Sequence, residues 1–305
     1  MFDELHVHVA HSPDPDDRLM FWPLAEGLVE SSVDGRNYLF SFEEADTHKL
    51  NQWASEGRAD VCAVSAIHAL RLLERYQPLR MGASVGDSYG PVIVTLKGGR
   101  GESLFKTSAE SCLDELLLLT PGESTTAHAI TQLLQFPFKS SKVVPIVPMA
   151  RVFEELEKQE SLGQPTAALL IHEGRLTFAD HNCVRLIDIG EQWTLRTNAS
   201  LPLGLNVVNR ALSEVSRRDI SLILRKSCKY AVEHREEFIR LAHTPEHRYS
   251  SPLSSKQLRH YLDLYANETT IDINPRDRQG FEELNTRAQR AGLLPTSTKM
   301  VIDWI

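Results

Sequence analysis

His172 is the residue whose position points most clearly to acid–base chemistry. It follows the continuous apolar run 167–171 and precedes Glu173 and Gly174. A predicted strand end of this kind delivers one titratable side chain to a cleft. Imidazole titrates near neutral pH, so His172 could act as a general base. A histidine with a purely structural role is the alternative, and position alone does not exclude it.

Hydroxyl side chains at two predicted helix starts could hold an anion. The first start lies in PGESTTAHA, where Gly122 allows the turn and the hydroxyls belong to Ser124, Thr125 and Thr126. The second lies in VSAIHA and contains Ser65. Unpaired helix-start amides beside hydroxyls suit a carboxylate or a phosphate. Ordinary helix caps are the alternative at both places, and no GK[ST] follows that would indicate a Walker loop.

The histidines of HVHVAH invite comparison with a metal site. His6 and His8 share one face of a predicted strand, and His11 lies beyond its end. The further ligands that a catalytic metal needs are not evident at later strand ends. The pattern therefore favours histidines on the exposed face of an edge strand.

Three carboxylates follow directly, at Asp14, Asp16 and Asp17. Magnesium binding or paired-carboxylate chemistry is one interpretation. Helix capping is the other, because Asp14 suits the N-cap, Pro15 suits the first helical position, and acidic groups complement the positive helix end. Capping accounts for at least two of the three carboxylates, so we expect no metal there.

The elements that must position these residues alternate between strands and helices over the first two thirds of the chain. The apolar pattern predicts strands at 5–9, 38–42, 59–65, 80–85, 91–96, 114–120, 142–148, 166–173, 183–189 and 200–209. It predicts helices at 14–28 (kinked at Pro23), 47–53 (capped by Thr47), 66–76, 124–136 and 150–161. From Ser213 onward the pattern is almost entirely helical, and 294–305 reads as a tail that could dock on the surface.

Three glycines in GGRGES, which begins at Gly98, predict a loop where the chain crosses between domains. The strand–helix pattern restarts after this loop. We therefore predict an α/β fold of two lobes with a cleft, the first formed by 1–96 plus 206–305 and the second by 97–205. Ligands in such sheets bind beyond the carboxyl ends of strands, where His172 and both hydroxyl segments are expected.

Composition excludes several classes of protein. The 305 residues are 42% hydrophobic and carry a formal net charge of -8, which argues against a nucleic-acid binder. The four cysteines show no CxxC spacing, as expected for reduced thiols in a cytosol. The sequence shows neither a membrane-spanning apolar stretch nor a signal peptide, so we expect a cytoplasmic protein without a membrane partner. It gives no prediction of oligomeric state.

Taken together, several motifs resemble the 1,4-dihydroxy-6-naphthoate synthase family of the futalosine route to menaquinone. The matching pieces are HSPDPDDRLMFWPLAEG, LNQWASEGRADVCAVSAIHAL, GDSYGP, TPGESTTAHAITQLL, ALLIHEGRLTF, IDIGEQW and LPLG at 201–204. They cover most of the chain from His11 to about Asn209 in one collinear order. The helical C-terminal third matches in type only.

The resemblance implies a type-2 periplasmic-binding-protein fold used as a cofactor-free cytosolic enzyme. It implies a carbon–carbon lyase that converts cyclic dehypoxanthinyl futalosine to 1,4-dihydroxy-6-naphthoate and dihydroxyacetone. By resemblance His172 is the proton acceptor. The two substrate-binding segments are Ala63, Val64 and Ser65, and Thr126 with Ala127. Further substrate-binding candidates are Asp14, Asp17, Ser124, Thr125 and Gly204.

Two other functions fit the same fold. A non-catalytic solute-binding protein would need the cleft but not His172, and it should be exported. A sister enzyme that dehydrates a chorismate-like acid would lack the IHEGRLTF context. Export, the IHEGRLTF context and turnover of cyclic dehypoxanthinyl futalosine separate these functions from the lyase.

Overall fold

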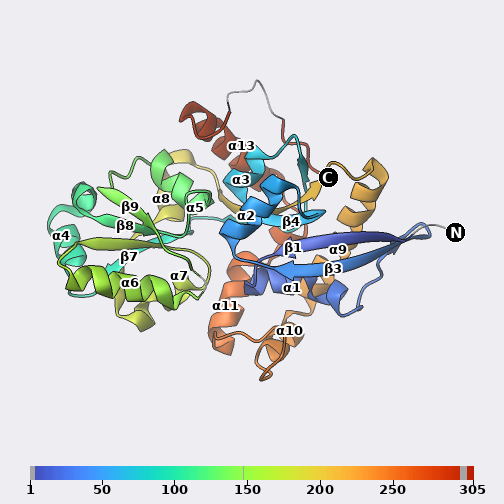
Figure 1. Ribbon diagram of the computed structural model, residues 1–305, viewed down its shortest axis with the longest axis horizontal. Helices are drawn as coiled ribbons and strands as arrows, with labels where there is room; N and C mark the ends of the chain where they lie inside the picture. Colours follow the sequence, from blue (N-terminus) through green and yellow to red (C-terminus); the bar gives the residue numbers. More distant parts are fainter. Residues whose placement is uncertain (1–3, 147, 296–300) are drawn as a thin grey trace.

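Two β-sheets, each with its own helices, make up the protein (Figure 1). The structure is a computed structural model that describes residues 4–146, 148–295 and 301–305. The five-stranded sheet lies on the left of Figure 1 and the seven-stranded sheet on the right. The chain is therefore not organised around one continuous sheet.

The seven-stranded sheet has the order β2-β3-β1-β4-β12-β5, with β6 also paired to β12. Its strands are β1 (Leu5–His11), β2 (Ser32–Val33), β3 (Arg36–Glu44), β4 (Val61–Ser65), β5 (Tyr76–Pro78), β6 (Ser84–Gly86) and β12 (Leu201–Asn209). β1 is parallel to β3 and β4, whereas β12 is antiparallel to β4. The carboxyl ends of β1, β3 and β4 therefore meet at one edge, which is the edge expected to bind ligands.

The five-stranded sheet has the order β11-β7-β10-β8-β9. Its strands are β7 (Val92–Leu96), β8 (Leu117–Thr120), β9 (Ser140–Val143), β10 (Thr166–Leu170) and β11 (Cys183–Asp188). β10 is parallel to β8 and antiparallel to β7. Every residue of β10 is buried, as its unbroken apolar run predicts for a central strand.

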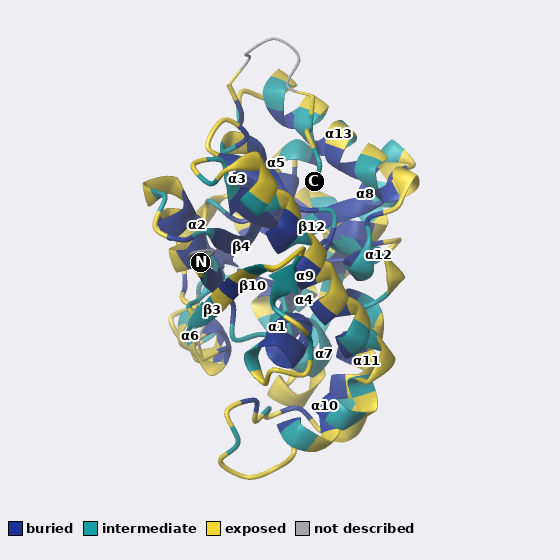
Figure 2. Ribbon diagram, turned by 90° about the vertical axis from the view of Figure 1, so that its right-hand side faces the viewer, coloured by how far each residue is buried: buried dark blue, intermediate teal, exposed yellow. Residues whose placement is uncertain are grey.

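Helices cover both sheets, and most of them expose one side to solvent (Figure 2). Their bounds are α1 (Pro15–Ala25), α2 (Thr47–Glu56), α3 (Ala66–Arg71), α4 (Arg100–Ser108), α5 (Thr126–Leu133), α6 (Ala150–Ser161), α7 (Gly174–Thr177), α8 (Ile189–Thr197), α9 (Glu214–Glu233), α10 (Arg235–Ala242), α11 (Ser255–Tyr265), α12 (Glu268–Ile271) and α13 (Pro275–Arg290). Within the described ranges, none of these helices combines the length and apolarity that crossing a membrane requires.

The C-terminal helices belong with the seven-stranded sheet. α9 packs along α1, and its buried stripe includes Ile220, Ile223 and Leu224. Part of the predicted tail, 296–300, lies outside the described residues. The end of the tail docks as expected: Ile305 pairs by backbone hydrogen bonds with Pro78 and Arg80, and Trp304 meets Phe281 edge-on.

Three predicted elements differ from the structure. GGRGES is not only a loop, because Gly99 is the N-cap of α4. The predicted strand 142–148 is replaced by β9 at Ser140–Val143. Thr47 does not cap its helix; the side chain of Asp46 accepts the hydrogen bond from the Lys49 amide and does so instead. This leaves the Thr47 hydroxyl available for another contact.

Strand pairing also bears on the predicted lobe boundaries. β7 pairs with β10 and β11, so the crossing between sheets comes before Val92 and not at Gly98. β12 begins at Leu201, ahead of the predicted return at 206. The apolar pattern of a strand does not say which sheet the strand joins, so the sequence alone could not place the two crossings. The division into two lobes near these positions stays a prediction.

The first crossing creates a close backbone approach at Gly190 in α8. A Cβ atom on Gly190 would overlap the backbone of Tyr89 and Gly90, which lie just before β7. We expect Gly190→Ala to lower the free energy of unfolding by about 1–3 kcal/mol, because backbone atoms cannot move aside cheaply. Urea denaturation measures the change. Exposed Glu191 is the control, and Glu191→Ala should change stability by less than about 0.5 kcal/mol; equal stabilities for the two variants would contradict the packing.

Candidate active site

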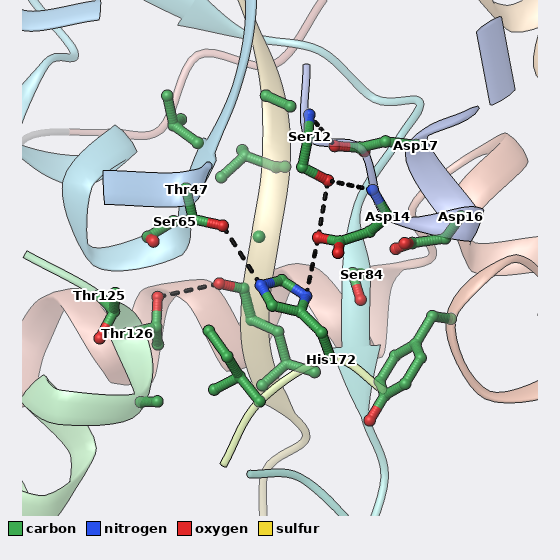
Figure 3. Close-up of a pocket in the computed structure, with 18 of the residues that line it drawn as sticks. Ser12, Asp14, Asp16, Asp17, Thr47, Ser65, Ser84, Thr125, Thr126 and His172 are labelled. Carbon is green, nitrogen blue, oxygen red and sulfur yellow. Dashed lines mark hydrogen bonds and ion pairs between the residues drawn. The ribbon is translucent and has the colours of Figure 1, made fainter. Parts of the chain in front are cut away.

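One pocket lies between the two sheets, at the carboxyl ends of β1, β3, β4, β8 and β10 (Figure 3). It brings together residues that are far apart in the sequence. Those that line it include Ser12, Asp14, Asp16, Asp17, Thr47, Ala63, Val64, Ser65, Ser84, Thr125, Thr126, Ala127, His172, Arg175, Gly204, Tyr261 and Tyr265. Of the residues that the sequence singled out for catalysis or binding, only Ser124 is missing from the lining.

His172 projects into this pocket from the segment after β10. The strand stops at Leu170, three residues earlier than predicted, and His172 adopts a left-handed backbone conformation with φ of 52°. Such a conformation is unusual for a residue other than glycine and needs support from its surroundings. The support comes from two side chains of the other sheet. His172 Nδ1 lies 2.9 Å from Asp14 Oδ2, and its Nε2 lies 3.3 Å from Thr47 Oγ1.

The Asp14 carboxylate fixes the tautomer of His172. An ionised carboxylate only accepts hydrogen bonds, so the hydrogen lies on Nδ1 and leaves Nε2 as the nitrogen that can exchange a proton with a ligand. Asp14 is itself oriented by Ser12, whose hydroxyl donates to Asp14 Oδ2 over 2.7 Å. The three side chains therefore form a chain from Ser12 through Asp14 to His172.

The two partners of this pair shift each other's pKa. Burial disfavours the charged form of both groups, but their mutual attraction and hydrogen bond outweigh it. The pKa of His172 rises to about 9, and the pKa of Asp14 falls below its ordinary value. At neutral pH the substrate-free pocket therefore holds an imidazolium–carboxylate pair.

Asp16 and Asp17 are residues of α1 and lie close to the His172–Asp14 pair. Burial and the neighbouring carboxylates raise the pKa of Asp16 to about 8, and burial raises the pKa of Asp17. Asp17 Oδ2 accepts a hydrogen bond from the Ser12 amide over 2.8 Å. Asp16 Oδ1 accepts one from the Tyr261 hydroxyl over 3.0 Å. One end of the pocket is therefore acidic.

The opposite end carries hydroxyl groups, as the sequence predicted, but several are already engaged. The Thr125 hydroxyl donates to the Gly122 carbonyl and accepts from the His128 amide as the N-cap of α5. The Thr126 hydroxyl donates to the Leu203 carbonyl over 2.9 Å and accepts from the Ile67 amide over 3.1 Å. Thr125 caps its own helix and Thr126 joins segments of the two sheets, so the contacts that remain for a ligand at α5 are its first backbone amides.

Ser65 differs from these threonines. Its amide donates to Asn51 Oδ1 over 3.0 Å, and its hydroxyl oxygen accepts from Asn51 Nδ2 over 3.2 Å. No acceptor for the Ser65 hydroxyl hydrogen lies among the residues that the structure describes. Ser124 is held outside the pocket lining, where its carbonyl and hydroxyl accept from Asn51 and its hydroxyl meets His48. Ser65 is therefore the hydroxyl best placed to donate to a ligand.

The N-terminal histidines lie apart from one another. His6 is exposed, His8 forms an ion pair with Glu43 over 3.2 Å, and His11 is buried against Phe21. His11 is the last residue of β1 and not a residue beyond it. In residues 4–146, 148–295 and 301–305 no three His, Cys, Asp or Glu side chains are arranged to hold a metal ion.

Sequence reasoning missed several lining residues. Tyr261 and Tyr265 come from α11, in the C-terminal third that was predicted only as helix. Thr47 was interpreted as a cap, and Asn51 gave no signal because its partners are distant in the chain. Arg175 belongs to IHEGRLTF, but its pairing with the buried carboxylate of Asp188 over 2.7 Å could not be predicted from spacing.

Comparison with known proteins identifies the family of this chain. A family model described as menaquinone biosynthesis matches residues 7–290. A protein of Thermus thermophilus named 1,4-dihydroxy-6-naphtoate synthase is 29% identical over 295 residues, which cover 96% of this chain and 97% of that protein.

Solved structures agree with this comparison. An Archaeoglobus fulgidus protein has 28% identity and a TM-score of 0.77, covering 95% of this chain and 98% of its own. A Candida albicans protein described as having the generic periplasmic binding protein structural fold has 11% identity and a TM-score of 0.65, over 96% and 92% of the two chains. The second likeness concerns the fold alone and confirms the two-lobed class predicted from the sequence. With nearly its whole length matched by the family model, the chain belongs to the menaquinone biosynthesis family.

Proposed function

We propose that the protein is a lyase that converts cyclic dehypoxanthinyl futalosine to 1,4-dihydroxy-6-naphthoate and dihydroxyacetone. The observation that carries this function is the His172–Asp14 pair, which stands in a pocket lined by segments that follow strands of both sheets, among them those of Ser65 and Thr126. The named relative from Thermus thermophilus supports the same reaction over nearly the full length of the chain.

His172 is the general base of this proposal. Its Nε2 becomes a proton acceptor once the imidazolium loses its proton, and Asp14 then holds the ring through Nδ1–H. Asp14 also stabilises the positive charge that returns when His172 takes the proton that starts fragmentation. In the substrate-free pocket the Thr47 hydroxyl contacts His172 Nε2 over 3.3 Å, so the substrate has to displace this contact.

The carboxylate of the substrate belongs at the opposite end of the pocket. There the Ser65 hydroxyl and the first amides of α5, at Thr126 and Ala127, can donate hydrogen bonds to it. Arg175 also lines the pocket, but its guanidinium is paired with Asp188 and with the Gly90 carbonyl. Both contacts are made by Nη1 and the Asp188 carboxylate neutralises the guanidinium, so we assign the anion to the hydroxyl and amide donors.

Closure of the cleft is part of the same proposal. Asp14 and Thr47 follow strands of the seven-stranded sheet, whereas His172 follows a strand of the other. The base and its carboxylate therefore come together only when the sheets approach, and the approach also excludes water. The four cysteines are free and buried, which suits the cytoplasmic location that we propose.

The direct test is turnover. Purified protein incubated with cyclic dehypoxanthinyl futalosine should form the naphthoate and dihydroxyacetone, followed by liquid chromatography. His172→Asn keeps the approximate size of the side chain but removes the basic nitrogen, so kcat should fall about a hundredfold or more. Substrate binding without turnover by the wild type would instead identify a solute-binding protein, and near-normal kcat in His172→Asn would refute the role of the base.

Ser65→Ala should weaken substrate binding without harming the fold. The lost hydrogen bond to a carboxylate is worth about 1.5–3 kcal/mol, equivalent to about a ten- to hundredfold rise in Kd. Asn51 Nδ2 keeps its contacts with Ser124 in this variant. Thr126→Val is the matched comparison, because it leaves the Ile67 amide and the Leu203 carbonyl unpaired. It should lower the melting temperature, which Ser65→Ala should not. Unchanged affinity in Ser65→Ala would remove this residue from the anion site.

The pH dependence of kcat/KM should report the His172–Asp14 pair. Because the pKa of His172 is raised to about 9, the neutral base is scarce at neutral pH, and kcat/KM should rise with pH on the acid side. Asp14→Asn removes the anion that raises this pKa, so the rising limb should move to lower pH while its plateau falls. Stopped assays across the pH range measure both effects. A rising limb at the same pH in Asp14→Asn would show that another group is titrating.

A further inference from the structure

Asp16 is a carboxyl group at the acidic end that the proposed mechanism does not use. It is 9% exposed, it lines the pocket, and its carboxyl group lies beside Asp14 in Figure 3. The Tyr261 hydroxyl donates to Oδ1 over 3.0 Å. Among the described residues no hydrogen-bond donor or cation contacts Oδ2, so this oxygen is open to a ligand.

The partners of the three carboxyl groups decide which of them keeps a proton. Asp14 has the His172 imidazolium and the Ser12 hydroxyl. Asp17 has a backbone amide, which donates a hydrogen bond that favours the ionised form, and His11 lies close enough to add a favourable charge. Asp16 has only a tyrosine hydroxyl. The positive end of α1 favours ionisation of all three and does not distinguish among them.

Three negative charges within one helical turn of a buried pocket would repel each other strongly. One imidazolium faces them, and it is already paired with Asp14. The other groups that face Asp16 bring no compensating cation: Glu173 follows His172, while Tyr261 and Tyr265 come from α11. The guanidinium of Arg175 is paired with Asp188. Protonation of Asp16 relieves this repulsion, because Asp16 has the fewest hydrogen-bond donors of the three carboxyl groups.

We propose that Asp16 acts as a neutral carboxylic acid that donates a hydrogen bond from Oδ2 to an uncharged, oxygen-bearing part of the substrate. This proposal rests on the proposed function for the identity of the substrate. The proposal assigns each end of the pocket to a different part of the substrate molecule. The carboxylate binds at Ser65 and α5, and the hydroxyl- or carbonyl-bearing part that leaves as dihydroxyacetone binds at Asp16, because a second anion would be repelled there.

Ionisation of Asp16 should therefore abolish its hydrogen bond to the substrate. Since the pKa of Asp16 is about 8, this loss should occur as the pH rises above neutral. The wild type should show a kcat/KM that rises as His172 loses its proton and falls as Asp16 ionises, with apparent values that belong to the coupled group. Asp16→Asn keeps a permanent donor of the same shape. It should retain most of the activity at neutral pH and lose the falling limb.

Two further variants sharpen the test. Asp16→Leu has no donor, and its KM should rise about tenfold, the value of one hydrogen bond, with a smaller change in kcat. Asp17→Asn removes a neighbouring charge but not the proposed donor. Its falling limb should persist and move to lower pH, because one repelling carboxylate is gone. A falling limb unchanged in Asp16→Asn, or a KM for Asp16→Asn as high as that of Asp16→Leu, would overturn the proposal.

The proton itself can be observed without substrate. Infrared spectra of the free protein should contain a carbonyl stretch of a protonated carboxyl group at neutral pH, which disappears on titration through about pH 8. The band should be absent in Asp16→Asn and present in Asp17→Asn. Its absence in the wild type would overturn the proposal even if the enzyme turns over. Its presence in a protein that does not turn over would place the failure in the proposed function alone.

Discussion

The contact between His172 and Asp14 joins the two halves of the molecule at the point where chemistry is proposed. His172 belongs to the five-stranded sheet and Asp14 to the seven-stranded sheet, and their side chains meet at 2.9 Å. The left-handed backbone at His172 is unfavourable on its own, so the pair and the Thr47 contact stabilise the segment as well as the ring. Thr126 makes further hydrogen bonds across the same boundary, with Ile67 and Leu203. These hold the two walls of the pocket together around the His172–Asp14 pair.

This pair also determines the electrostatics of everything near it. A buried carboxylate is tolerated when a cation and hydrogen-bond donors face it, which holds for Asp14 and in part for Asp17. Asp16 has no such partner, and its pKa rises to about 8 as a result. The pocket therefore has an acidic end near α1 and a donor-rich end near α5. A ligand with one anionic end and one neutral polar end has a single favourable orientation between them.

The sequence predicted the parts of the site that depend on local pattern. The βα junctions that carry Ser65, Thr126 and His172 were predictable because strand ends, turn residues and helix starts have short-range signals. The parts that it missed depend on contacts between distant segments. Thr47 was predicted as a cap, but Asp46 takes that place and frees the hydroxyl for His172. The raised pKa of Asp16 could not be predicted either, since it comes from burial in the folded pocket together with the neighbouring carboxylates of Asp17 and Asp14.

The fold is shared with proteins described only as binding proteins, so the chemistry must come from what the cleft contains. Most lining groups here would serve binding alone: the Ser65 hydroxyl, the α5 amides and the tyrosines donate hydrogen bonds but exchange no proton at neutral pH. His172 differs because its imidazolium, whose pKa is about 9, can lose a proton to become a base, and because Asp14 leaves only one of its nitrogens free. Since the two residues come from different sheets, the base is complete only in the closed cleft. In the proposed mechanism, binding energy that closes the cleft therefore also assembles the catalyst, and this coupling is how a binding fold can become an enzyme.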